Sequence, residues 1–272
     1  MAAWIHDEGM AQGSRARQED DYGVFELPPE LGAGDLLLVL ADGMGGERGG
    51  ALASALAVRE FIKTYDAINA MTIPDRLEQT LLHVNVQMGR EAATDPESLS
   101  GMGCTLLAVV LAEEGLYWIS VGDSPLWLWR CGRLHRLNED HAYRSILAHR
   151  VAAGEISADI AARHPDRNAL MSAVTGDVLE LVDLPRRARA LRAGDQILLA
   201  SDGVLTLSEQ QIAAMLKHNP QIDGTPCQTL LSAVAAHARP HQDNITVLWA
   251  QASGLSSNHS WWRRAWRRLG TS

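Results

Sequence analysis

Residues 36–50 read LLLVLADGMGGERGG, and this stretch is the most informative part of the sequence about the fold. Its first six residues are all aliphatic, which is typical of a buried β-strand. Asp42 follows at once, and the glycines after it let the backbone turn sharply and approach other groups closely. A helical pattern then occupies residues 50–65. The stretch therefore predicts a strand, an acidic turn and a helix, in that order.

Other parts of the chain repeat these elements. Apolar runs bounded by Gly, Asp or Ser predict further strands at residues 105–112, 116–121, 126–130, 196–200 and 245–250. Glu114-Gly115 and Cys131-Gly132 predict hairpin turns, and therefore antiparallel pairing. Helical patterns occupy residues 76–93, 142–153, 208–217 and 225–238. Because the strands come in groups, we expect an α+β protein. Two antiparallel sheets covered by helices would fit, although periodicity alone does not fix the number of layers.

Acidic residues recur at the ends of these predicted strands. Each of five strand ends carries one, at Glu19-Asp20, Asp42, Asp123, Asp202 and Asp243. Strands of one sheet end side by side, so these carboxylates could converge, and burying them without compensation would cost several kcal/mol each. A cation resolves the conflict, and oxygen ligands select Mg²⁺ or Mn²⁺ over zinc. The alternative is that each Asp-Gly or Gly-Asp pair is only a turn.

Composition narrows the classes of function. The chain of 272 residues has a formal net charge of −9, which disfavours nucleic acid as a partner. Cys104, Cys131 and Cys227 are odd in number and form no C-x-x-C, so neither a disulfide framework nor a thiolate zinc site is expected. The chain has no run of 18 apolar residues and no secretory signal at its N-terminus, so we expect a cytoplasmic protein. The oligomeric state stays open, and a monomer is our working expectation.

Six motifs in order connect the sequence to a known family. They are QGSRARQED (12–20), ADGMGGERGG (41–50), GMGCT (101–105), VGDS (121–124), ASDGV (200–204) and QDNIT (242–246). Together they resemble the metal-dependent serine/threonine protein phosphatases of type 2C (the PPM family), bacterial branch, from about residue 8 to residue 250. The resemblance implies an αββα sandwich, in which two central antiparallel sheets are flanked by helices and the metal site lies at one edge.

The resemblance also implies roles for individual residues. A centre of two Mn²⁺ or Mg²⁺ ions would be held by Asp20, Asp42, the carbonyl of Gly43, Asp202 and Asp243. A third, weaker ion would be shared by Asp123 and Asp202. Glu19 and Asn244 are expected beside these ligands, with Glu19 holding metal-bound waters. Arg15 is expected to bind the phosphate, for which a planar guanidinium is well suited.

The implied reaction is hydrolysis of phosphoseryl and phosphothreonyl proteins by a metal-bridged hydroxide, opposing a bacterial Ser/Thr kinase. Asp42 and Asp202 would be catalytic through the metals, and Arg15 through the phosphate. Met44 stands where animal relatives carry a histidine, so the leaving-group proton must come from elsewhere. Two alternatives remain open: a catalytically silent regulator that binds phosphoproteins, and a hydrolase of small phosphoesters.

We expect one catalytic domain over residues 1–254, with a surface flap at about 138–180. Asp140-His141 opens this flap, and a surface or capping role is expected for the histidine, with a functional role as the alternative. Residues 255–272 form a tail that contains WWRRAWRR, from Trp261 to Arg268. Three tryptophans and four arginines suit contact with a membrane surface or an acidic partner. Docking of the tail on the chain's own domain is the alternative.

Overall fold

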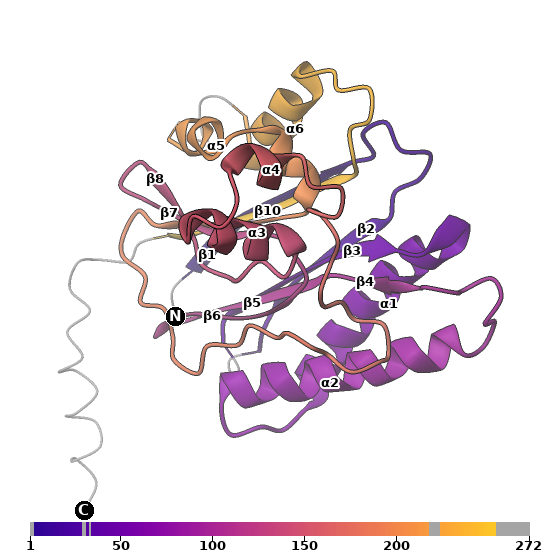
Figure 1. Cartoon of the computed structure of the whole chain (residues 1–272). Coiled ribbons are helices and arrows are strands. Elements are labelled where there is room, and N and C mark those ends of the chain that lie inside the picture. The colour runs from indigo at the N-terminus through magenta and orange to yellow at the C-terminus, as the bar shows by residue number, and fades with distance from the viewer. Residues whose placement is uncertain (1–2, 29–30, 33, 218–223, 254–272) are drawn as a thin grey trace, which may run out of the picture.

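The computed structural model describes residues 3–28, 31–32, 34–217 and 224–253, and its strands form two sheets (Figure 1). The first sheet has the strand order β1-β10-β9-β7-β8, and the second β2-β3-β5-β6, with β4 pairing with β3. Every strand pairing is antiparallel. The first sheet consists of β1 (Ala3–Ala11), β7 (Leu126–Arg130), β8 (Arg133–Arg136), β9 (Gln196–Ala200) and β10 (Ile245–Ser253). The second consists of β2 (Asp20–Glu26), β3 (Leu36–Met44), β4 (Gly103–Cys104), β5 (Leu106–Ala112) and β6 (Gly115–Val121).

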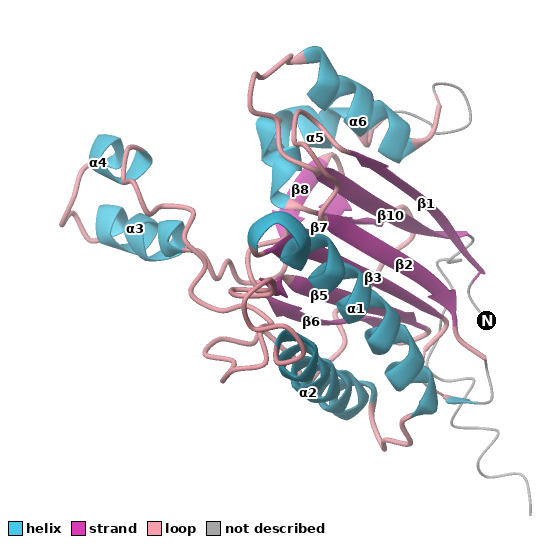
Figure 2. Ribbon diagram, turned by 90° about the vertical axis from the view of Figure 1, so that its right-hand side faces the viewer, coloured by secondary structure: helices cyan, strands magenta, loops and turns pink. Residues whose placement is uncertain are grey.

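Helices cover the outer face of each sheet (Figure 2). The helices α1 (Gly46–Ala67) and α2 (Ile73–Ala92) pack on the second sheet, whereas α5 (Glu209–Met215) and α6 (Pro226–Ala236) pack on the first. The predicted α+β sandwich of two antiparallel sheets flanked by helices is thus confirmed. In the part of the chain that the structure describes, α3 (Tyr143–Ala152) and α4 (Ala158–Ala162) stand away from the sandwich. A short 3₁₀ helix, η2 (Asp202–Thr206), follows β9.

Side-chain alternation along β3 explains how a continuous apolar run builds two cores. Leu37 and Val39 point to the helical side and join the core under α1 and α2. Leu38 and Leu40 point the other way and join the core between the sheets. A third core lies between the first sheet and its helices α5 and α6. Because both faces of β3 are buried, the strand has no polar alternation.

The strands and helices predicted from the sequence are present, with shifts at their ends. The helix α2 starts at Ile73, three residues earlier than predicted, because the Thr72 side chain caps its N-terminus and Pro74 fits the first turn. Ser208 and Gln211 form a complete capping box at the start of α5. The strand β1 was not predicted from its own sequence, and pairing with β10 holds it at the sheet edge.

The expected tail, residues 255–272, lies outside the described residues. Among the residues that the structure does describe, no helix is long and apolar enough to cross a membrane.

Candidate metal centre and its pocket

Pairing between β2 and β3 brings the first two acids together. Asp20 begins β2 and lies directly opposite Asp42 in the antiparallel register. Asp20 is buried, and its Oδ2 accepts hydrogen bonds from the hydroxyls of Ser201 (2.7 Å) and Thr246 (2.8 Å). The backbone N–H of Asp42 donates to Thr105 Oγ1 at 3.0 Å. Neighbouring strand ends therefore fix both carboxylates beside each other.

The backbone at Gly43 has no room for a side chain. A Cβ there would lie 2.1 Å from the carbonyl oxygen of Gly50 and 2.5 Å from that of Glu19. The Gly43 N–H donates to the same Glu19 carbonyl at 3.0 Å. Glycine is therefore required for the turn after Asp42 to pack against the loop that carries Glu19.

The next two acids lie at the adjacent ends of β9 and β10. Asp202 follows β9 as the first residue of η2, and Asp243 precedes β10 by two residues. Asn244, between Asp243 and β10, accepts from the Glu19 N–H at 2.9 Å and donates to the carbonyls of Gln12 and Arg17. Asn244 therefore ties the loop of residues 12–19 to the first sheet, and this bridges the two sheets at the site.

Asp123 lies in the turn between β6 and β7, and a neighbouring histidine supports this turn. His141 Nδ1 accepts a hydrogen bond from the Gly122 N–H at 3.2 Å. The expected surface role of His141 is wrong, because the side chain is buried and burial lowers its pKa. Asp140 Oδ1 accepts from the Ala142 N–H at 3.0 Å and so closes a tight turn before α3, which has no side-chain cap.

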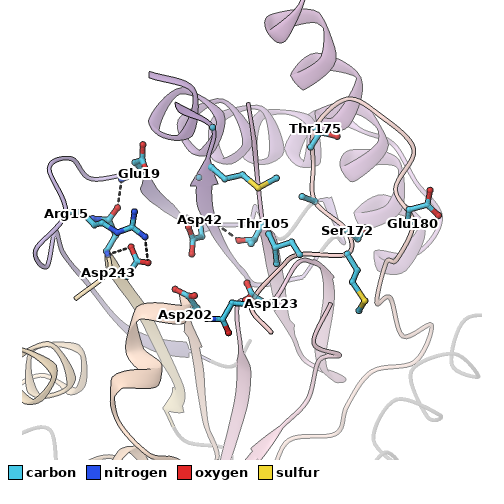
Figure 3. A pocket seen from close by; sticks show the side chains of 18 of the residues that line it. Arg15, Glu19, Asp42, Thr105, Asp123, Ser172, Thr175, Glu180, Asp202 and Asp243 are labelled. Atoms are coloured by element: carbon cyan, nitrogen blue, oxygen red, sulfur yellow. Dashed lines mark hydrogen bonds and ion pairs between the residues drawn. The ribbon is translucent and has the colours of Figure 1, made fainter. Parts of the chain in front are cut away.

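These elements enclose a pocket of about 830 Å³ (Figure 3). Asp42, Asp123, Asp202 and Asp243 line it, and Asp20 is buried behind them. Arg15 and Glu19 line the same pocket, and Arg15 donates to Asp243 Oδ2 at 2.6 Å. The opposite wall is formed by residues that follow α4, namely Asn168, Leu170, Met171, Ser172, Ala173, Thr175, Val178 and Glu180. The structure thus brings together the residues that the resemblance implies for the site, namely Arg15, Glu19, Asp20, Asp42, Gly43, Asp123, Asp202, Asp243 and Asn244.

Burial and mutual repulsion make ionisation of three of these acids, Asp20, Asp42 and Asp202, unfavourable. Burial raises the pKa of Asp20 to about 6, although the hydrogen bonds from Ser201 and Thr246 lower it in part. Burial, together with the charges of Asp123 and Asp243, raises the pKa of Asp202 to about 7. The pKa of Asp42 lies well above its usual value for the same two reasons. Without compensating positive charge, these three carboxyls hold their protons to unusually high pH.

The donor set fits hard divalent ions. The ligating atoms on offer are carboxylate oxygens, and Asp20 Oδ1 is buried without any hydrogen-bond partner. A buried carboxylate oxygen left unpaired costs free energy that a cation would recover. Within the described ranges, no three acidic, His or Cys side chains enclose one point closely enough to hold an ion by themselves. Carbonyl oxygens and waters would therefore complete the coordination, as is usual for Mg²⁺.

Sequence reasoning missed the polar residues that support the acids. Thr105 Oγ1 lies 2.8 Å from Ser124 Oγ and also accepts the Asp42 N–H, so it links two strand ends. Ser201 lies next to Asp202, and its Oγ accepts the Thr246 N–H at 2.9 Å. Both residues fall inside quoted motifs, but only their location in the fold shows what they contact.

Comparisons with known proteins agree with this geometry. Residues 14–242 match the family model described as "Protein phosphatase 2C". The "Serine/threonine phosphatase stp" of Listeria monocytogenes is 31% identical over 250 residues, covering 90% of this chain and 94% of that protein. The solved structure of the Mycobacterium tuberculosis serine/threonine phosphatase PstP/Ppp is 28% identical with a TM-score of 0.73, covering 92% of this chain and 99% of that one.

A further solved structure contains the catalytic domain of PstP in complex with two manganese ions. It is 28% identical with a TM-score of 0.73, and the match covers 92% of this chain and 99% of that one. The family match and these relatives confirm the resemblance to bacterial metal-dependent phosphatases that the six motifs indicate. Together with the buried aspartates at the sandwich edge, they show that the chain belongs to the protein phosphatase 2C family.

Proposed function

We propose that this chain hydrolyses phosphoserine and phosphothreonine in proteins at a centre of two Mn²⁺ or Mg²⁺ ions. One observation carries the proposal: aspartates from separate strand ends gather at one pocket, with an arginine at its side. When bound, the ions supply a water of lowered pKa and positive charge that offsets the charge of the phosphate. The PstP catalytic domain with two manganese ions supports this assignment.

The proposed ligands are the acids that the fold brings to the pocket. Asp20, Asp42, Asp202, Asp243 and the carbonyl of Gly43 would hold the two ions. Asp123 and Asp202 would share a third ion. Glu19 lines the pocket and would orient waters on the ions.

Arg15 is the proposed phosphate-binding group. One of its nitrogens donates to Asp243, and a guanidinium has five N–H donors in all, so donors remain for a phosphate. The pairing with Asp243 also orients the side chain toward the ligands. A substrate phosphate held there would lie between the arginine and the ions.

The cysteines are poor candidates for a nucleophile, which supports a water-based mechanism. Cys104 and Cys227 are buried, and burial raises the pKa of both thiols far above the usual value. Cys131 is exposed, but it lies in the hairpin between β7 and β8 and does not line the pocket. Met44 lines the pocket and has no proton to donate, so a solvent molecule would protonate the leaving group.

We also propose a biological setting for this activity. Phosphorylated proteins would be the substrates, a cognate bacterial Ser/Thr kinase would supply them, and the enzyme would act in the cytoplasm as a monomer. For residues 255–272 we propose contact with an anionic membrane surface. Deleting them should release the protein from anionic vesicles, and unchanged vesicle binding would exclude that role.

Hydrolysis of a phosphothreonine peptide, with and without Mn²⁺, tests the function directly. We expect manganese-dependent hydrolysis that Asp202→Asn abolishes. Asp159→Asn is the matched control, since the Asp159 side chain on α4 is exposed to solvent, and it should leave the hydrolysis rate unchanged. Activity without metal would contradict the proposal. Metal binding without activity would favour the silent phosphoprotein-binding regulator, and preference for small phosphoesters over the peptide would favour the other alternative.

A further inference from the structure

Arg144 connects α3 to the acidic pocket. Its Nη2 donates to Asp123 Oδ2 at 2.9 Å, and its Nε donates to Asp140 Oδ2 at 2.7 Å. The side chain is only 18% exposed, and that of Asp123 only 6%. A nearly buried guanidinium therefore bridges two carboxylates, one in the turn between β6 and β7 and one just before α3.

This contact occupies a carboxylate that the proposed third ion would need. Asp123 lines the pocket and, together with Asp202, is the candidate ligand pair. One of its two oxygens is bonded to Arg144, and its backbone carbonyl accepts from Arg136 at 3.0 Å. Two guanidinium groups, that of Arg144 on α3 and that of Arg136 on β8, thus already contact Asp123.

We propose that Arg144 and the third divalent ion compete for Asp123, so that docking of α3 and occupation of the third site oppose each other. The inference rests on the proposed function, in which Asp123 helps to hold an ion. A charge-assisted hydrogen bond is strong and takes up a lone-pair position of the carboxylate oxygen, so an ion that ligates the same oxygen must compete with it. In addition, a divalent ion on Asp123 would be repelled by the guanidinium bound to the same carboxylate; for charges separated by about 5 Å, even at the dielectric constant of water, this repulsion would weaken ion binding by about tenfold.

Asp140 makes the exchange feasible. It lies four residues before Arg144, and its bond to the guanidinium would remain when the bond to Asp123 breaks. Arg144 would therefore move from two carboxylate partners to one, and no unpaired charge would be left in a partly buried position. The backbone contacts of this region, Tyr143 N–H to the Ala169 carbonyl and Arg144 N–H to the Arg167 carbonyl, belong to the segment itself and need not break.

Binding of Mn²⁺ to the full chain without substrate tests the competition. Arg144→Gln is compared with Arg150→Gln, which changes the charge equally on the same helix but loses only a partner of exposed Glu155. Titration calorimetry and the electron paramagnetic resonance of free Mn²⁺ give the number and affinity of the sites. We expect the weakest site to bind about tenfold tighter in Arg144→Gln, and to stay as in the wild type in Arg150→Gln.

Equal or weaker third-site affinity in Arg144→Gln would overturn the inference while leaving the two-ion centre intact. If none of the proteins bound Mn²⁺, the proposed function itself would fail. Arg144→Lys provides a second measurement should Arg144→Gln fold poorly. Lysine keeps the charge but cannot donate to both carboxylates in the same fixed geometry, so its third site should bind more tightly than that of the wild type by a smaller factor.

Hydrogen exchange gives a readout that does not depend on counting ions. In the wild type, raising Mn²⁺ until the third site fills should speed amide exchange in α3 (Tyr143–Ala152). In Arg144→Gln these amides should exchange faster from the start and respond little to the added ion. An amide exchange rate in α3 that does not change with Mn²⁺ concentration in the wild type would contradict the proposed competition.

Discussion

Removing one carboxylate from the metal-free pocket should stabilise the protein. The pKa of Asp202 is about 7 in the folded chain, against a reference value of 3.8. A shift of this size corresponds to about 4 kcal/mol at pH 8, at about 1.36 kcal/mol per unit. Part of it belongs to the coupling with Asp123 and Asp243, and water in the pocket screens part of it. We therefore expect Asp202→Asn to raise the free energy of unfolding by about 1–3 kcal/mol.

The effect must depend on pH in a definite direction. Because folding raises the pKa of Asp202, its carboxyl favours the folded state when protonated. That contribution is fully present below the unfolded pKa and is lost as pH rises through the folded value. The advantage of Asp202→Asn should therefore be small near pH 4, grow up to about pH 7 and stay level above it.

Thermal unfolding in a metal chelator at pH 4.5, 6 and 8 provides the assay. For a chain of this size, 1–3 kcal/mol corresponds to an increase in Tm of about 3–10 °C at pH 8. Asp159→Asn, whose carboxylate is exposed on α4, serves as the control and should change Tm by about 1 °C or less. A Tm of Asp202→Asn below that of the wild type at pH 8, or a gain that does not vary with pH, would refute the reasoning.

Three other predictions concern ion binding, support of the ligands and substrate binding. Because Asp20 and Asp202 hold protons with pKa values of about 6 and about 7, Mn²⁺ binding should release at least about one proton more at pH 6 than at pH 8. Calorimetry in buffers of different ionisation enthalpy measures this difference. Ser201→Ala removes a donor to Asp20 and the acceptor of the buried Thr246 N–H, so chemical denaturation should show a free energy of unfolding lower by about 1–3 kcal/mol. The control Ser232→Ala, at an exposed position, should lower it by less than about 0.5 kcal/mol. Arg15→Ala should lower kcat/KM for a phosphopeptide by about 10- to 100-fold, mainly by raising KM, and Arg15→Lys should restore only part of that loss. An unchanged KM in Arg15→Ala would show that Arg15 does not bind the phosphate.

Local signals explain why so much of the sandwich could be predicted. The strands β3, β5 and β9 are buried on both faces, so their sequences are mostly Leu, Ile, Val and Ala, and each stops at a polar turn. Residues 3–11 carry no such signal, because β1 is an edge strand with charged Asp7 and Glu8. Only its pairing with β10, more than 230 residues away in sequence, makes it a strand.

The candidate site divides in the same way. The sequence by itself determined which acids end the strands, that their ligand chemistry suits hard divalent ions, and that six ordered motifs resemble one family, since all of these depend on neighbouring residues in the chain. Only the tertiary structure decided that Asp20 lies opposite Asp42, that Ser201 and Thr246 bond to Asp20, and that Arg144 reaches Asp123. The physical reason is that burial, repulsion and competition for a carboxylate depend on distance in space, which strand register and the packing of two sheets set.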